Sequence, residues 1–197
     1  MENYMNIAVG ESSAKHQERR GSRQGYQEMS EGPAPAGLGP DEIAFLSERD
    51  SIYIASAGED GWPYVQHRGG PPGFIRVIDA THLAWAERSG NRQFLSAGNL
   101  DHDERISIIA VDYPNRQRIK LYGRAHFNPS PTADELASLG FDGRAEGVMN
   151  VEVVAYSWNC PKYITPRFTT DQVRAVVEPL QARIEELENQ LKAVAAT

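Results

Sequence analysis

Short stretches of alternating apolar and polar residues, separated by turn-forming residues, dominate the chain between residues 41 and 165. Such alternation is typical of half-buried strands. The pattern predicts a short helix over Asp41–Arg49, whose apolar residues Ile43, Phe45 and Leu46 can face inward, and then seven strands. The expected strands are Ser51–Ala57, Trp62–His67, Phe74–Asp79, His82–Glu87, Arg105–Asp112, Arg118–His126 and Val148–Trp158. Many short strands with few helices favour a mainly β fold, an antiparallel barrel, over a doubly wound parallel sheet.

A second periodicity begins near Thr169, which together with Gln172 has the spacing of a helix capping box. The helix that it opens can run to Ala196. Its apolar residues alternate spacings of four and three, which is typical of a coiled-coil seam. They are Val173, Val177, Leu180, Ile184, Leu187, Leu191 and Val194. This stripe can pack against the barrel or pair with the same helix of another subunit, and Pro179 predicts a kink or break.

Residues 1–40 differ from the rest in being rich in Gly, Ser, Glu and Arg. The segment Glu31–Pro40 holds three glycines and three prolines and is not expected to form a helix. We therefore expect a flexible N-terminal arm over residues 1–40, a barrel over 41–167 and a heptad helix over 168–197. The arm could instead wrap a partner subunit, with Tyr4, Met5 and Tyr26 as anchors.

Composition narrows the functional classes. The chain has 197 residues, of which 40% are hydrophobic and 24% charged, so a folded domain is expected. The net charge of -7 argues against nucleic-acid binding. No secretory signal or membrane span is recognisable, and the single cysteine, Cys160, suits a reducing compartment, so we expect a cytoplasmic protein. The five histidines are scattered without ligand spacing, and no metal site is expected.

Two basic, glycine-bearing stretches concentrate the candidate chemistry. In the first, Tyr64–Gly73 (YVQHRGGPPG), Gln66, His67 and Arg68 offer successive donors, and the glycines permit close approach of a ligand to the backbone. Taken alone, this sequence is equally compatible with a rigid loop.

In the second stretch, Glu87–Asn99 (ERSGNRQFLSAGN), a strand is expected to end and a helix to begin at Asn91. Arg92 and Gln93 would then lie in the first helical turn, where free amides and the helix dipole favour a phosphate. Taken alone, an arginine in a first helical turn is more often a solvated surface residue.

The order of these motifs resembles the pyridoxamine 5'-phosphate oxidase family. Its members present a strand with a basic loop, a strand, a basic helix start, and two further strands, and here the corresponding segments are PYVQHR, LAWAE, GNRQ, DERISIIAVDY and YGRAHF. A flavin-nucleotide-binding branch is more similar still, since QHRGGPPGF and the C-terminal WNCPKYITPR, residues 158–167, match its motifs. The resemblance covers residues 41–167 and implies a split β-barrel that binds FMN.

The resemblance also implies which residues bind the cofactor. Arg92 and Gln93 would hold the FMN phosphate, with Asn91 opening the helix. The positions expected along the ring and ribityl chain are Val65, Gln66, His67, Arg68, Ala86 and Glu87. Arg118, or Gln117 after a one-residue slip, matches a flavin-contacting glutamine of the family. The positions expected to approach from the second subunit of a homodimer, where the family binds its cofactor, are Trp158, Asn159 and Cys160.

Physically, FMN requires a clamp for its phosphate, apolar walls for its ring, and a donor or positive charge at the ring edge. Arg92 can serve the first, one of three tryptophans the second, and Arg68 or His67 the third. Vitamin B6 oxidation is not expected, because the family's substrate-holding Arg-x-His element is absent and Gln93 replaces a lysine. Two hypotheses remain. One is an FMN-dependent oxidoreductase that passes electrons from NAD(P)H to a small substrate or oxygen. The other is a non-catalytic module that binds, stores or senses flavin, haem or a deazaflavin.

Overall fold

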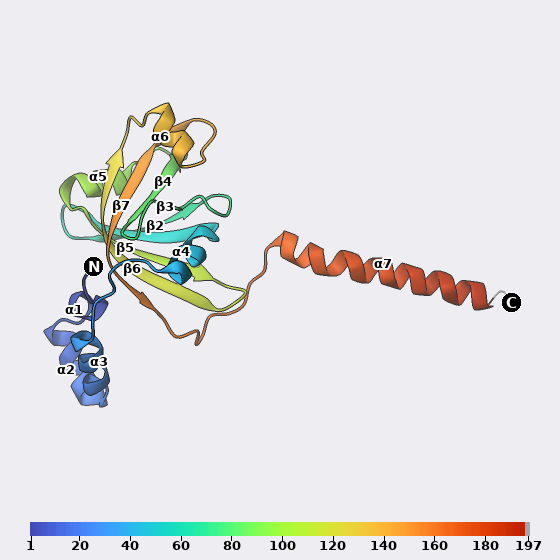
Figure 1. Ribbon diagram of the computed structural model, residues 1–197, viewed down its shortest axis with the longest axis horizontal. Helices are drawn as coiled ribbons and strands as arrows, with labels where there is room; N and C mark the ends of the chain where they lie inside the picture. The colour runs from blue at the N-terminus through green and yellow to red at the C-terminus, as the bar shows by residue number, and fades with distance from the viewer. Residues whose placement is uncertain (196–197) are drawn as a thin grey trace. The chain divides into compact units, whose positions relative to one another are not determined.

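The computed structural model describes residues 1–195, in which seven strands form one antiparallel sheet (Figure 1). The strands are β1 (Ser51–Ala57), β2 (Pro63–Gly69), β3 (Arg76–Val77), β4 (His82–Arg88), β5 (Arg105–Asp112), β6 (Gln117–Asn128) and β7 (Ala145–Trp158). Their order across the sheet is β2-β1-β5-β6-β7-β4-β3. The predicted mainly β fold, an antiparallel split barrel with a C-terminal helix, is confirmed.

Three hairpins join neighbours in sequence: β1 with β2, β3 with β4, and β5 with β6. β1 and β5 have the predicted bounds, whereas the predicted strand Phe74–Asp79 is wrong in extent, because only β3 enters the sheet. The Phe74 amide donates to the Pro71 carbonyl oxygen at 2.9 Å, and this turn keeps the first residues of the segment out of the ladder.

The core is built on the alternation of β1 and β5. Ile52 and Ile54 of β1 pair with Ala110 and Ile108 of β5, and all four side chains are buried. Burying one aliphatic side chain of this size stabilises the fold by about 1.5 to 3 kcal/mol. These two neighbouring strands therefore form the centre of the barrel, although they are 48 or more positions apart in sequence.

Helix α4 (Pro40–Ser47) adds Phe45 and Leu46 to this core, as predicted. Ile43, which was also expected to face inward, is 36% exposed. The buried side of the helix is the i, i+3, i+4 face of Glu42, Phe45 and Leu46, and residue 43 lies outside it.

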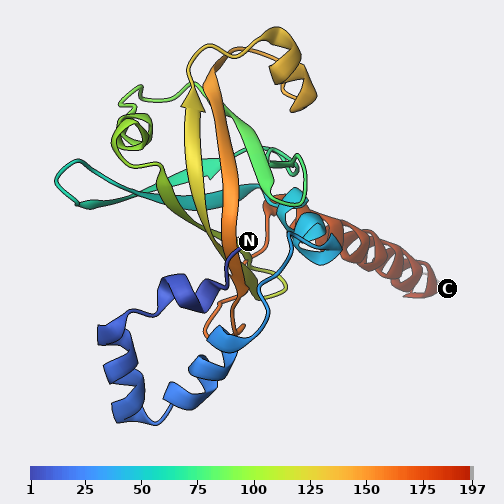
Figure 2. The same cartoon turned by 60° about the vertical axis from the view of Figure 1, so that its left-hand side comes forward.

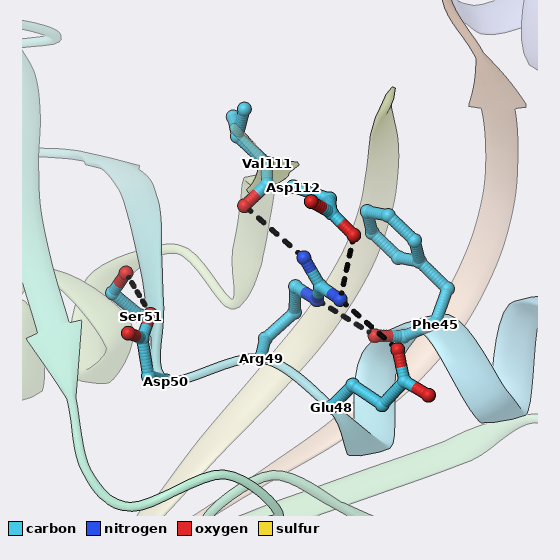
Figure 3. Close-up of polar contacts among 7 residues, drawn as sticks. All are labelled: Phe45, Glu48, Arg49, Asp50, Ser51, Val111 and Asp112. Atoms are coloured by element: carbon cyan, nitrogen blue, oxygen red, sulfur yellow. Dashed lines mark hydrogen bonds and ion pairs between the residues drawn. The ribbon is translucent and has the colours of Figure 1, made fainter. Parts of the chain in front are cut away.

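A buried ion pair ties the end of α4 to the end of β5 (Figure 3). Nη2 of Arg49 lies 3.1 Å from Oδ2 of Asp112, and both side chains are only 9% exposed. The same guanidinium donates through Nε to the Phe45 carbonyl oxygen at 2.9 Å, and so also satisfies the last turn of α4. The Arg49–Asp112 pair joins residues that lie 63 positions apart in sequence.

Residues 4–31 form three short helices, α1 (Tyr4–Ala8), α2 (Glu11–Arg20) and α3 (Arg23–Glu31), which Figure 2 shows in succession. These helices were not anticipated from the sequence. Tyr4, suggested as an anchor on a partner, is buried on its own chain, with its ring stacked 4.9 Å from that of Tyr122. Burial and the neighbouring Tyr4 raise the pKa of Tyr122. Flexibility of the arm stays a prediction.

Residues 113–116 together with residues 161–195 form a compact unit distinct from the rest of the described chain. Its helix α7 (Thr170–Ala195) has the predicted capping box: the Thr169 amide donates to Gln172 Oε1 at 2.9 Å, and the Gln172 amide donates to Thr169 Oγ1 at 3.2 Å. A kink or a break was expected at Pro179, and the break is wrong, because one helix continues through this residue (Figure 1). Ala175, whose carbonyl loses its helical partner, is exposed and can be hydrated instead.

Two smaller helices lie between strands: α5 (Leu95–His102) and α6 (Ala133–Ser138). Thr132 caps α6, which was not predicted, by accepting from the Glu135 amide at 3.1 Å. None of the helices within residues 1–195 has the length and apolar character needed to cross a bilayer.

Candidate functional site

A cavity of about 340 Å³ lies between β2, β4, the loop at residues 89–94 and the start of α5. We call it the β2–β4 pocket. Its volume falls in the range of small-ligand sites. Eight of the residues predicted to bind a cofactor border it together: Gln66, His67, Arg68, Ala86, Glu87, Asn91, Arg92 and Gln93. Two separate stretches of sequence thus meet at one hollow.

Strand alternation decides which side chains of β2 face the pocket. Gln66 and Arg68 are partly buried, whereas Val65 is 62% exposed and does not border the pocket. The ring of His67 packs edge-on against Tyr53 of β1, with the centroids 5.5 Å apart. Arg68 and not the His67 ring is therefore the cationic group that β2 directs into the site.

Arg68 is held in a polar network under the pocket. Its Nε donates to Oε1 of Glu87 at 2.7 Å, and the indole Nε1 of Trp85 donates to the same oxygen at 2.8 Å. Nη2 of Arg68 donates to Oγ of Ser96 at 3.4 Å, and this hydroxyl donates to Oε1 of Gln66 at 3.1 Å. The Glu87 carboxylate compensates the buried charge of Arg68, so the guanidinium is pre-oriented at low cost.

The loop after β4 corrects the prediction that a helix begins at Asn91. Helix α5 begins only at Leu95, because Arg92 and Phe94 have φ values of 59° and 51° and cannot belong to a right-handed helix. Asn91 Oδ1 accepts a hydrogen bond from the Gln93 amide at 3.2 Å, which stabilises a turn in place of the helix. Asn91 therefore stabilises the loop. The free amides of the first turn of α5 come after this loop in the sequence, from Leu95 onward.

Opposite Arg92, strand β7 contributes a carboxylate through a bulge. Glu87 pairs with Gly147 and Arg88 with Ala145, so Glu146 has no partner in the ladder and points out of register. Its Oε1 accepts from Oγ of Ser89 at 2.8 Å and lies 3.7 Å from Nε of Arg92. The Arg92 side chain is 67% exposed, so this ion pair is weak and the arginine can turn toward a ligand.

Further pocket residues were not assigned from the sequence. They include Phe74, Arg88, Phe94, Leu95, Phe127, Glu146 and Met149. Phe74 and Phe127 are the last residues of the QHRGGPPGF and YGRAHF motifs, so the sequence carries a signal for them. No such signal marks Glu146, since a bulge follows from strand pairing. Of the tryptophans at 62, 85 and 158, only Trp85 borders the pocket.

The remaining predicted residues gather elsewhere in the same unit, where β6 begins and β7 ends. Ile119 pairs with Trp158, and the Asn159 amide donates to the Arg118 carbonyl oxygen at 3.1 Å. None of the predicted residues in this group borders the β2–β4 pocket: Gln117, Arg118, Trp158, Asn159 and Cys160. Oδ1 of Asn159 is buried without a hydrogen-bond donor among residues 1–195.

Trp158 is anchored on helix α4. Its Nε1 donates to Oε1 of Glu42 at 2.6 Å, and its ring meets that of Phe45 edge-on at 4.8 Å.

Burial, and then the charge of Glu42, raise the pKa of Tyr156 above its usual value. Cys160 is exposed. In the part of the chain that the structure describes, no cluster of three His, Cys, Asp or Glu side chains could hold a metal.

Comparison with known proteins gives a family match. A family model for pyridoxamine 5'-phosphate oxidase matches residues 40–158, which is more than half of the chain and runs from the start of α4 to the end of β7. No curated protein matches.

Several solved structures are similar over most of their own length. HupZ from Group A Streptococcus is 17% identical, with coverage of 66% of this chain and 100% of that chain and a TM-score of 0.49. An FMN-binding protein from Syntrophomonas wolfei subsp. wolfei is 9% identical, with coverage of 73% and 97% and a TM-score of 0.45. A FAD-binding protein from Mesorhizobium loti is 15% identical, with coverage of 61% and 94% and a TM-score of 0.43.

Proposed function

Because the chain belongs to the pyridoxamine 5'-phosphate oxidase family, as its motifs predicted, we propose that it is a flavoprotein that binds FMN in the β2–β4 pocket. The observation that carries this proposal is the meeting of eight predicted residues at one cavity. Three arginines, Arg68, Arg88 and Arg92, border that cavity together with aromatic and aliphatic side chains. Such a lining suits a ligand with an anionic tail and a planar apolar ring.

The loop and the start of α5 would hold the phosphate. Arg92 is exposed and only weakly paired with Glu146, so it can form charge-assisted hydrogen bonds with a dianion. The Gln93 side chain adds a neutral donor. Leu95 and Ala97 of the first turn of α5 border the same pocket, and the amides of this turn lack helical partners.

The ring would lie along the apolar wall of the pocket. Phe94 and Leu95 are exposed, and they are the side chains best able to cover a planar ligand. Trp85 is fully buried, so it supports the floor and does not stack on a ligand. Arg68, fixed by Glu87, would direct guanidinium N–H donors at the ring edge, where hydrogen bonds favour the reduced, anionic form. The flavin itself would supply hydride and single-electron chemistry.

We propose further that the protein is an oxidoreductase that takes electrons from NAD(P)H and passes them to a small substrate or to oxygen. Pyridoxamine phosphate is not the proposed substrate, because the substrate-holding Arg-x-His element is missing. The site would be completed in a homodimer by the group at Trp158, Asn159 and Cys160 of a second copy, with Arg118 or Gln117 beside it. Oδ1 of Asn159 is buried and accepts no hydrogen bond within residues 1–195. A donor from a second copy of the chain would satisfy this oxygen, and this supports the homodimer.

The first test is the absorption spectrum of the purified protein with and without added FMN. An oxidised-flavin spectrum that copurifies, or saturable binding, supports the proposal. A colourless protein that does not bind FMN refutes it, and a Soret band would indicate haem instead. Anaerobic addition of NADPH then tests the oxidoreductase: bleaching of the flavin band is expected, and an unchanged band would leave a flavin-binding module.

Arg92→Ala tests the phosphate site. Loss of one charge-assisted contact is expected to reduce the free energy of FMN binding by about 2 to 3 kcal/mol. This raises the dissociation constant by roughly 30- to 150-fold. Arg105→Ala is the matched control, because Arg105 is also an exposed arginine paired with a carboxylate, Asp103, but lies outside the pocket. Equal affinities of the two variants would contradict the assignment.

A further inference from the structure

Helix α7 carries a continuous apolar stripe that is exposed. Its 26 residues span about 39 Å at the rise of an α-helix. The stripe consists of Val173, Val177, Leu180, Ile184, Leu187, Leu191 and Val194, and every one of these side chains is exposed. Exposing a regular seam of leucine and isoleucine to water costs free energy in an isolated helix. The stripe therefore indicates a surface that another helix covers.

We propose that α7 pairs with α7 of a second copy of this chain as a parallel, in-register, two-stranded coiled coil. The heptad places Val177, Ile184 and Leu191 at a positions. It places Leu180 and Leu187 at the central d positions, between Val173 and Val194. In the central layers Val177 and Ile184 are β-branched at a while Leu180 and Leu187 are at d, and this combination favours two parallel strands over higher oligomers.

Charges beside the seam are compatible with the same arrangement. Arg183 is at a g position and Glu188 at the e position of the next heptad, which are the positions that meet across a parallel pair. Two symmetric Arg–Glu pairs form in this way. An antiparallel pair that matches a with d layers would instead bring Arg183 close to Arg183 of the other helix and Arg174 close to Glu188, so a charge change at Arg183 distinguishes the two arrangements. In the single chain, Arg183 pairs within its own helix with Glu186, which is exposed and can exchange with the partner's carboxylate.

Pro179 is compatible with this seam. It is at a c position, on the side of the helix that faces away from a partner, and the helix continues through it. The lost backbone hydrogen bond therefore lies on the solvent side, where water can replace it. The apolar layers on either side, Val177 and Leu180, remain in register.

A coiled coil of little more than three heptads is weak by itself, so it would gain from a second contact between the same chains. If the barrels also form a dimer, joining the helices becomes an intramolecular event at millimolar effective concentration. The coiled coil does not require flavin, however, and its test has a readout that is separate from FMN absorbance. Failure of either proposal can thus be recognised without the other.

Disulfide trapping in the full-length chain tests the pairing. In a Cys160→Ser background, Leu187→Cys puts a thiol at a d position, where it faces its own copy only in a parallel, in-register pair. In the antiparallel pair Leu187 meets Val177. Mild oxidation is expected to convert most of Leu187→Cys into a covalent dimer. Asn189→Cys, at the outward f position, is the matched control and is expected to stay monomeric on denaturing gels. Absence of the Leu187→Cys dimer, or equal yields for the two variants, would overturn the proposal.

A charge exchange tests the orientation independently. Arg183→Glu turns both interhelical pairs into like-charge pairs and is expected to weaken association by roughly tenfold. Adding Glu188→Arg restores opposite charges only in the parallel arrangement, so the double variant is expected to recover the association of the parent in sedimentation equilibrium. If the double variant is as weak as Arg183→Glu or weaker, the helices do not pair in this way.

Discussion

The buried contact between Arg49 and Asp112 offers a sharp test of how α4 is attached to the barrel. Asp112→Ala removes the carboxylate and leaves the guanidinium in a site where the side chain is only 9% exposed. Removing one partner of a buried pair costs about 3 to 5 kcal/mol. Arg49 keeps its hydrogen bond to the Phe45 carbonyl at 2.9 Å, so we expect the lower end, about 3 kcal/mol.

The matched control is Glu48→Ala. Glu48 binds the same nitrogen of Arg49 at 3.3 Å, but its side chain is 71% exposed, so its loss is expected to cost at most about 1 kcal/mol. Both variants are compared with the parent by urea unfolding, followed by tryptophan fluorescence and circular dichroism. The double variant Arg49→Met with Asp112→Ala is expected to lose less free energy of unfolding than the two single variants lose together. Similar losses for Asp112→Ala and Glu48→Ala would refute the reasoning that burial, and not contact alone, gives this pair its effect.

Two further substitutions test the pocket wall and an acid-sensitive turn. In Gly147→Ala the new methyl group would collide with the Phe127 ring and lie 2.6 Å from a backbone oxygen, so a loss of about 1 to 3 kcal/mol and weaker FMN binding are expected, measured by thermal melting and flavin titration. Hydrogen bonds from the Thr81 amide and His82 lower the Asp79 pKa from 3.8 to about 2. Asp79 therefore stabilises the fold above pH 3.8 and less as pH falls toward 2, so melting temperatures of parent and Asp79→Asn should converge on acidification. A constant gap would contradict this.

Local periodicity was sufficient to predict most of the sheet. The alternation in β1 and β5 marks their bounds to the residue, because a strand with one buried face repeats every two positions. The same rule shows why Val65 is outside the pocket while Gln66 borders it. The motif order was enough to recognise the family.

Where local rules compete, the predicted elements differ from those of the structure. The helix expected at Asn91 begins at Leu95, since the Asn91 side chain stabilises a turn and Arg92 and Phe94 adopt left-handed conformations. The break expected at Pro179 does not occur, because an exposed helix tolerates one unpaired carbonyl. Both cases depend on small local free-energy differences that residue type alone does not resolve.

The sequence by itself determined the local features of the chain. These are the alternation in the strands, the heptad seam of α7 and the two basic motifs. The tertiary structure alone decided which of those residues meet. Arg68 pairs with Glu87 from 19 positions away, and Arg49 with Asp112 from 63 positions away. Glu146 turns toward Arg92 only because β7 bulges against β4. Such contacts follow from the register between strands, which is set by the packing of the whole core and not by the neighbours of any one residue.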